Sequence, residues 1–245
     1  MFTVILAIMN REVRRSPNGL RSQSRSLSIE NSQFMSKVYM WMTLGVLMTG
    51  LVAYYISTKP ELIALFFSNR ILSYAVMFAP VIFSFFLYGA IRKLSFGLGL
   101  VSYFAFAVIL GISLSTIFLA YNLGTIQNAF YITAGSFAGL SIFGYVTKID
   151  LKAIGSFCIM GFFGLFAIGM LSFVFPGMLS GQFGYIYNIA CVAIFSGLTA
   201  YQTQKIKEMK NGSGELNKMA LLGAFTLYIS FINLFMSILR LMSRD

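Results

Sequence analysis

The sequence predicts an all-α, polytopic membrane protein with seven transmembrane helices. Of its 245 residues, 58% are hydrophobic and only 10% are charged, whereas about 25% of the residues of an ordinary soluble domain are charged. The charged residues crowd into short segments between long uncharged runs. A soluble core cannot use this much apolar surface, so the composition indicates a chain that folds in a lipid bilayer.

Seven segments are long and apolar enough to cross a membrane, which takes about 20 mostly apolar residues per helix. They cover residues 38–57, 71–91, 97–120, 125–146, 153–175, 184–204 and 219–241. None of them contains Asp or Glu, because all seven acids of the chain fall in the N-terminal tail or in the connectors. The cost of burying a charge in lipid accounts for this distribution.

The basic residues predict the orientation and the domain division. Of the 18 Lys and Arg residues, 14 fall on the side of the N-terminus and four on the other side. Because Lys and Arg accumulate in cytoplasmic loops, the N-terminus is predicted in the cytoplasm and the C-terminus outside. Residues 1–36, rich in Ser, Arg and Asn, are predicted to form a basic, disordered cytoplasmic tail, and residues 37–245 a single seven-helix membrane domain.

Several function classes lack the residues that they require. His is absent, and the two cysteines, Cys158 and Cys191, lie isolated inside apolar runs. A zinc site, a disulfide framework and a Ser-His-Asp set are therefore not expected, and the sequence predicts no enzyme, no metal site and no cofactor. Membrane topology explains the net charge of +11, so the expected partner is the lipid bilayer and not nucleic acid.

A polar stripe runs along the last span. Its members follow one another at steps of four, three, four and three, which places them on one helix face; they are Thr226, Ser230, Asn233, Ser237 and Arg240. Such a stripe avoids lipid, so this face is expected to look into the bundle. It either forms hydrogen bonds with other helices or lines a narrow wet cavity, and the sequence leaves both alternatives open.

The sixth span carries a similar stripe of Ser196, Thr199 and Thr203, with Gln202 beside its end. The sequence alone leaves open whether the stripes of the sixth and seventh spans face each other. Small residues mark further candidate packing faces, because they let two helix backbones approach in lipid. They are Gly45 with Gly50, Gly111 followed by Ser113 and Ser115, Gly135 with Gly139, and Gly161 with Gly164.

Two segments resemble the signatures of a known family. "SGLTAYQTQKIKEM" (196–209) and "GAFTLYISFINLFMSILRLM" (223–242) look like the signature segments of the Bax inhibitor-1 family, also called the transmembrane Bax inhibitor motif family. The similarity extends to "FMSKVYMWMTLGVLMTGLVAY" (34–54), "SLSTIFLAY" (113–121) and "FYITAGSFAGLSIFGYVTKIDL" (130–151). The resemblance implies a seven-helix fold in which six helices surround the last one.

The resemblance also implies an activity that this chain does not match fully. Members are associated with a cation leak, best described for calcium, and its pH sensor is a pair of aspartates in the sixth and seventh helices. The residues at these positions are Gln202 and Ser230, which carry no charge at any accessible pH. An arginine that many members carry near the cytoplasmic end of the second helix aligns with Ala90, and Arg92 follows two residues on.

Two function hypotheses follow from these residues. In the first, the fold provides a leak pathway lined by Gln202, Ser230 and Asn233, with weak or absent calcium conductance because carboxylates are missing. In the second, the protein is a non-conducting scaffold that binds and modulates another membrane protein, such as a quality-control protease. A transporter whose contacts with its substrate are all neutral is a further alternative. In each case the expected location is a bacterial cytoplasmic (inner) membrane.

Overall fold

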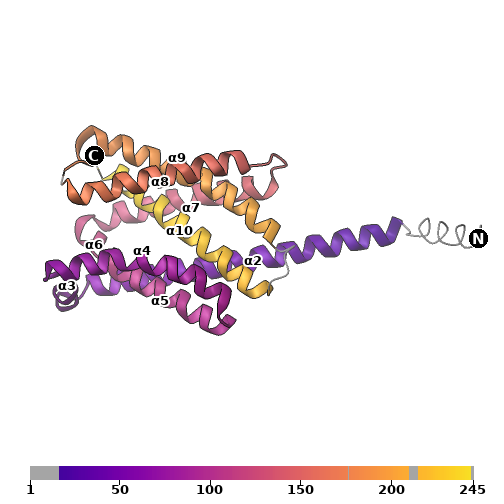
Figure 1. Cartoon of the computed structure of the whole chain (residues 1–245), viewed down its shortest axis with the longest axis horizontal. Helices are drawn as coiled ribbons and strands as arrows, with labels where there is room; N and C mark the ends of the chain where they lie inside the picture. Colours follow the sequence, from indigo (N-terminus) through magenta and orange to yellow (C-terminus); the bar gives the residue numbers. More distant parts are fainter. Residues whose placement is uncertain (1–16, 176, 210–214, 244–245) are drawn as a thin grey trace, which may run out of the picture.

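The computed structural model describes residues 17–175, 177–209 and 215–243, and every regular element in these ranges is a helix (Figure 1). The predicted all-α class is confirmed. The helices are α2 (Pro17–Ser57), α3 (Pro60–Phe67), α4 (Arg70–Lys93), α5 (Phe96–Leu114), α6 (Ile117–Ala120), α7 (Leu123–Val146), α8 (Lys152–Val174), α9 (Gly181–Met209) and α10 (Leu216–Met242).

Within the described residues, seven helical segments are long and apolar enough to span a membrane, as predicted. They are Ser32–Ser57, Arg70–Ile91, Phe96–Ala120, Leu123–Val146, Lys152–Val174, Gly181–Met209 and Leu216–Met242. Each coincides with a predicted segment, and the ends differ by six residues at most. The third span consists of α5 and α6, and the short α3 lies in the connector between the first two spans.

Short polar side chains define where several helices begin. The side chains of Asn69, Ser95 and Asn122 each accept a hydrogen bond from a backbone N–H in the first turn of α4, α5 and α7, respectively. These caps satisfy amide groups that would otherwise lack a partner. Pro60 begins α3, where its missing N–H costs nothing.

The predicted N-terminal tail needs correction. α2 begins at Pro17, so residues 17–36, expected to be disordered, form the first part of the helix that becomes the first span. Phe34 and Met35 are buried in the bundle, so the membrane domain begins before residue 37. Once a span has formed, extending it by further residues is cheap compared with nucleating a new helix. Residues 1–16 lie outside the described part.

The last helix is the centre of the bundle. α10 packs against α2, α4, α5, α7 and α9, and in Figure 1 it runs diagonally between the group of α2, α4 and α5 and the group of α7, α8 and α9. In the most apolar stretch of α10, 67% of the residues are buried, more than in any other of the seven spans. The central position of the last helix, implied by the family resemblance, is therefore confirmed, while α8 packs mainly against α9.

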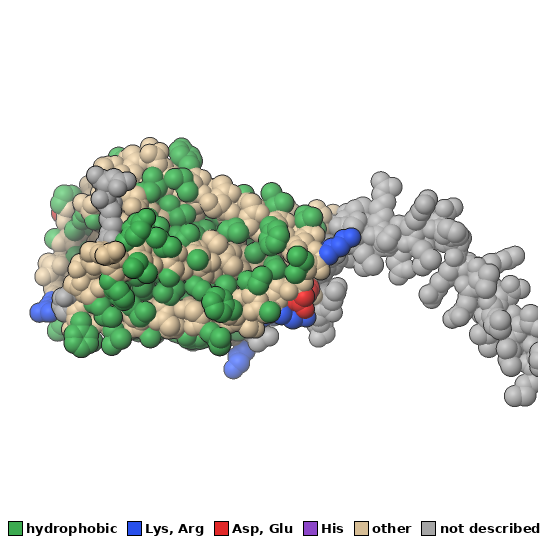
Figure 2. Space-filling model, turned by 90° about the horizontal axis from the view of Figure 1, so that it is seen from above, with side chains coloured by type: hydrophobic (Ala, Val, Ile, Leu, Met, Phe, Trp, Pro, Cys, Tyr) green, Lys and Arg blue, Asp and Glu red, His purple; other side chains and the backbone are tan. Residues whose placement is uncertain are grey.

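Charged and apolar side chains are separated on the surface. On the face shown in Figure 2, hydrophobic side chains cover the side of the bundle, and Lys, Arg, Asp and Glu lie toward its ends. Many large apolar residues on the outer helices are exposed, among them Phe85 of α4 and Met160 of α8. Such a band of exposed apolar side chains is what a lipid-facing surface requires.

The predicted glycine faces are confirmed in part. Gly45, Gly111 and Gly161 each lie against a neighbouring helix, where even a methyl group would collide with Tyr103, Val52 and Ile194, respectively. No helix of the described residues packs on the remaining glycines, which face open space: Gly50, Gly135, Gly139 and Gly164. Spacing alone does not reveal whether a small-residue face meets a helix of its own chain.

Candidate functional site

Gln202 and Ser230 lie in direct contact between α9 and α10. The Ser230 hydroxyl donates a hydrogen bond of 2.6 Å to the side-chain Oε1 of Gln202. Ser230 is only 1% exposed, whereas Gln202 is half-buried. The two positions selected from the family pattern are therefore partners, and the contact between them is neutral.

Three other polar residues of the last span donate side-chain hydrogen bonds within their own helix. Thr226, Asn233 and Ser237 donate to the carbonyl groups of the residues four positions earlier, at 2.9, 2.8 and 2.8 Å. Ser and Thr side chains in helices often form this local bond. Within the described part of this stripe, Ser230 forms a side-chain hydrogen bond to another helix.

The prediction that the whole stripe looks into the bundle is wrong for Arg240. Ser230 and Ser237 are buried and Thr226 and Asn233 are half-buried, but Arg240 is exposed. It lies in the last turn of α10, where a cation interacts favourably with the helix dipole and the long side chain can reach the membrane surface. The buried part of the stripe therefore ends at Ser237.

The stripe of the sixth span lies inside the bundle. Thr199 and Thr203 are fully buried, and each donates to a carbonyl of α9 four residues earlier; Ser196 is half-buried. α9 and α10 pack closely along this face. The two helices therefore meet, which the sequence left open. Most of their polar side chains, however, form hydrogen bonds within their own helix.

Tyr228 forms a second polar contact of α10, on a face that the stripe does not include. Its hydroxyl lies 2.6 Å from Oγ1 of Thr49 in α2. Because Thr49 donates its own hydrogen to the carbonyl of Ala107 in α5, at 3.0 Å, Tyr228 is the donor to Thr49. Sequence reasoning missed Tyr228, since one tyrosine in an apolar run gives no periodic signal.

Gln204, two residues beyond Gln202 in the same motif, anchors the connector between α7 and α8. Its Oε1 accepts from the backbone N–H of Leu151 at 2.9 Å, and its Nε2 donates to the carbonyl of Ile149 at 2.8 Å. Two helical steps turn a side chain by about 200°, so Gln202 and Gln204 point to opposite sides of α9. The motif therefore serves two contacts; the family pattern selected Gln202, and nothing in the sequence indicated the contact of Gln204.

The same connector contains the acid Asp150, which lies outside the spans. Its carboxylate accepts a hydrogen bond from the backbone N–H of Lys152 at 3.0 Å and forms a salt bridge of 3.3 Å with the Lys152 ammonium group. The backbone hydrogen bond, followed by the interactions with the Lys152 side chain, lowers the pKa of Asp150 below its ordinary value.

Ala90 and Arg92 are the two positions near the family arginine, and the structure describes the side chain of the first. Ala90, which aligns with the family arginine, is buried near the end of α4. The side chain of Arg92 lies outside the described residues. Among the residues that the structure does describe, no group of three or more His, Cys, Asp or Glu side chains is placed to hold a metal ion.

A comparison with known protein families shows which family the chain belongs to. The family model described as "Inhibitor of apoptosis-promoting Bax1" matches residues 31–245, which include both signature segments and the whole bundle. The chain belongs to the Bax inhibitor-1 family. The predicted membership is confirmed.

Relatives from several bacteria support this membership of the Bax inhibitor-1 family. The chain is 35% identical to the "Inner membrane protein YbhL" of Escherichia coli over 213 residues, which cover 85% of this chain and 90% of that protein. It is 32% identical over 229 residues to an uncharacterized protein of Borreliella burgdorferi, covering 92% and 97% of the two chains. An uncharacterized membrane protein of Streptococcus pyogenes is 30% identical over 218 residues, or 87% and 93%.

Proposed function

We propose that this protein is a multi-pass protein of a bacterial inner membrane that acts by binding another membrane protein, without a proton gate between α9 and α10. The name of the Escherichia coli relative supports the location. The 14 Lys and Arg residues on the side of the N-terminus favour a cytoplasmic N-terminus and a C-terminus on the other side.

The observation that carries this proposal is the neutral contact between Ser230 and Gln202. A gate that responds to protons needs a group that titrates, and two close carboxylates would provide one by coupling their pKa values. A hydroxyl and an amide do neither. With Ser230 1% exposed and bonded across to Gln202, this position joins the two helices at every pH and does not open on protonation.

An unused helix-packing face supports a role in binding. Gly135 and Gly139 of α7 are exposed, and a Cβ added at either position would meet no atom within 4 Å. Glycines four residues apart let a second membrane helix approach closely. A transmembrane helix of another protein, such as a membrane-bound protease, fits this face.

The test replaces Gly135 and Gly139 by Leu and measures which membrane proteins can be crosslinked to the chain in native membranes. The control is Gly164→Leu on α8, where an added Cβ also meets open space. We expect the variant on α7 to lose a specific crosslinked partner while its thermal stability and that of the control remain those of the wild type. Equal crosslinking of the same partners by all three proteins would contradict the proposal.

A second candidate function is a weak cation leak, and the half-buried position of Gln202 and Asn233 favours it. Their amide oxygens can coordinate hard cations, although calcium sites draw much of their affinity from carboxylates. In liposomes, this leak would show slow calcium flux with the same rate between about pH 5 and 8, where only His or perturbed groups titrate.

The same assay separates the two candidates and tests the missing gate. We expect no flux above empty liposomes for a scaffold, and the double variant Gln202→Asp/Ser230→Asp to gain pH-dependent flux that neither single variant shows, because only a coupled acid pair restores the sensor. Steep pH-dependent calcium flux in the wild type would refute both candidates.

A further inference from the structure

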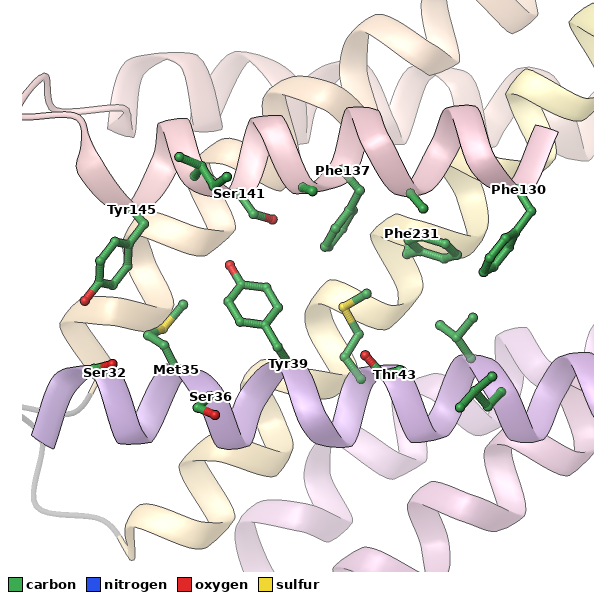
Figure 3. Close-up of a pocket in the computed structure, with 16 residues that line it drawn as sticks. Ser32, Met35, Ser36, Tyr39, Thr43, Phe130, Phe137, Ser141, Tyr145 and Phe231 are labelled. Atoms are coloured by element: carbon green, nitrogen blue, oxygen red, sulfur yellow. The ribbon is translucent and has the colours of Figure 1, made fainter. Parts of the chain in front are cut away.

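A groove separates α2 from α7 on the side of the bundle. It is lined by α2 residues between Ser32 and Leu47, by α7 residues between Phe130 and Tyr145, and by Phe231 of α10 at its back (Figure 3). We call it the α2–α7 groove. Its volume is about 670 Å³, within the range of about 300–1,000 Å³ typical of ligand pockets. Leu47 and Ile142 in its lining are exposed, so the groove is open to the surrounding lipid.

The lining changes character along the groove. The end formed by the start of the first span and the close of α7 carries hydroxyl groups, from Ser32, Ser36, Tyr39, Ser141 and Tyr145. The other end is apolar and formed by Val46, Leu47, Phe130 and Phe231. Figure 3 shows this gradient from left to right. A molecule that fits must therefore have a polar end and an apolar end.

The length of the groove matches one leaflet of a bilayer. The lining of α2 runs from Ser32 to Leu47, a rise of about 22 Å at 1.5 Å per residue. Half of a bilayer with its head groups measures about 20–22 Å. A second cavity of about 550 Å³ begins where the groove ends. Val46, Phe130 and Phe231 line both. A lipid of one leaflet fits this length better than a helix that crosses the whole membrane.

One polar atom in the groove lacks a partner. Ser141 is 5% exposed, and its Oγ forms no hydrogen bond within the described part of the chain, unlike the hydroxyl groups of Thr133 and Thr199, which bond to their own helices. Burial of a hydroxyl without a hydrogen-bond partner is unfavourable. In Figure 3 the hydroxyl groups of Ser141 and Tyr39 point toward each other across the groove, so a polar atom between them would satisfy Ser141.

A positive charge lies at the polar end. The ammonium group of Lys207 in α9 donates to the backbone carbonyl of Tyr145 at 2.9 Å and lies 4.7 Å from the centre of the Tyr145 ring, and Tyr145 lines the groove. No salt bridge of Lys207 is present among the described residues. An ammonium group has three donors, so Lys207 keeps donors for an anionic group at the groove mouth.

We propose that the α2–α7 groove binds one anionic phospholipid, with an acyl chain along Phe137 and Phe231 and with the phosphate group at the polar end beside Lys207. The length of the groove, the polarity gradient, the unpartnered Ser141 and the position of Lys207 each favour this occupant. The phosphate and ester oxygens supply acceptors for Lys207 and the hydroxyl groups. This inference does not depend on the proposed function.

The test uses the full-length protein in nanodiscs that contain either phosphatidylglycerol or phosphatidylcholine with a photoreactive group on the acyl chain. Crosslinked peptides are mapped by mass spectrometry. Ala138→Trp fills the groove from an exposed position of its lining, and Ser136→Trp is the matched control, because Ser136 is exposed on the same helix but does not line the groove. Circular dichroism and size-exclusion chromatography show that each variant is folded.

We expect phosphatidylglycerol to label the segments 32–47 and 130–145, Ala138→Trp to abolish this labelling, and Ser136→Trp to leave it unchanged. Lys207→Gln should reduce the preference for phosphatidylglycerol over phosphatidylcholine about fivefold, which corresponds to about 1 kcal/mol for one Lys beside an anionic lipid. Equal labelling of all spans, insensitivity to Ala138→Trp, or equal labelling by both lipids would overturn the proposal. So would a crosslink between two copies of the chain at the groove.

Discussion

α8 and α10 show that apolarity and burial are different properties of a membrane helix. α8 contains the stretch of highest mean hydropathy among the seven spans, but only 6% of that stretch is buried. The corresponding stretch of α10 has a lower mean hydropathy, and 67% of it is buried. α8 packs mainly against α9, and α10 packs against five helices. An apolar helix has no hydrophobic driving force to move from the lipid into the interior of the bundle, because the lipid chains are equally apolar.

The features that place α10 at the centre are its polar groups and their directions. Ser230 bonds to Gln202 of α9, and Tyr228 bonds to Thr49 of α2. These two residues are two helical steps apart, so they point to opposite sides of α10. A helix with polar groups on opposite sides has no face that suits lipid, and the interior is the one place where both are satisfied.

The largest expected effect comes from the same truncation in the two helices. Leu234 of α10 is 0% exposed and Leu171 of α8 is 45% exposed. We expect Leu234→Ala to lower the free energy of unfolding by about 2–5 kcal/mol, because it leaves a cavity in a packed interior. Leu171→Ala should change it by less than about 0.5 kcal/mol. Unfolding in detergent, followed by circular dichroism, measures both; a large cost at Leu171 would mean that α8 is covered in an oligomer.

A smaller effect is expected where α8 does touch the bundle. A Cβ at Gly155 would collide with the ring of Tyr201 in α9, whereas a Cβ at Gly164 would meet open space. Overfilling a tight contact costs about 1–3 kcal/mol, so Gly155→Val should destabilise the protein by this amount more than Gly164→Val. Both variants place a β-branched residue in the same helix, and the difference between their melting temperatures therefore reports the contact. Equal melting temperatures would show that α8 can shift away from α9.

Removing one hydrogen bond of α10 should have a still smaller effect. Tyr228→Phe deletes the hydroxyl that donates to Thr49, but Thr49 keeps its bond to Ala107 and is not left without a partner. Hydrogen bonds between membrane helices average about 0.6 kcal/mol and reach about 1.7 kcal/mol, and we expect a loss in this range. Tyr131→Phe, at a side chain that is 69% exposed, is the control in the same unfolding assay and should have no effect.

Much of the fold was predictable because the bilayer imposes a simple rule on the sequence. Seven long apolar segments without acids predicted the seven spans, and the spacing of the polar stripe predicted that Ser230 looks into the bundle. The family pattern selected Gln202, and the structure joins it to Ser230. These features depend on local periodicity, which the sequence contains.

The contacts that were not predicted depend on which helices become neighbours. Tyr228 is a single polar residue whose partner is 179 positions away, and the partners of Gln204 are 53 and 55 positions away. No local pattern identifies such partners. The spacing of Gly135 and Gly139 indicates a packing face, but the neighbour that would use it is not in the described chain. Arg240 continues the period of the stripe and is exposed because the helix ends there.

The smallest expected effect concerns pH, and it lies in the connector that precedes α8. The pKa of Asp150 is lowered below its ordinary value of 3.8, chiefly by the backbone N–H of Lys152 and then by the Lys152 side chain. A group with a lowered pKa in the folded state stabilises the protein above its unfolded pKa and loses this contribution as the pH falls through its folded pKa. The contribution of Asp150 is therefore complete above about pH 4 and disappears at lower pH.

Asp150→Asn should remove this dependence. The wild type should be slightly more stable than the variant at pH 7, and the difference between their melting temperatures should vanish below the folded pKa of Asp150. The effect is small because Asp150 and Lys152 are exposed and solvent screens such pairs. A melting temperature that falls steeply in acid in both proteins would point to another titrating group. Because Gln204 holds this connector through Ile149 and Leu151, the position of α8 should not change in either protein.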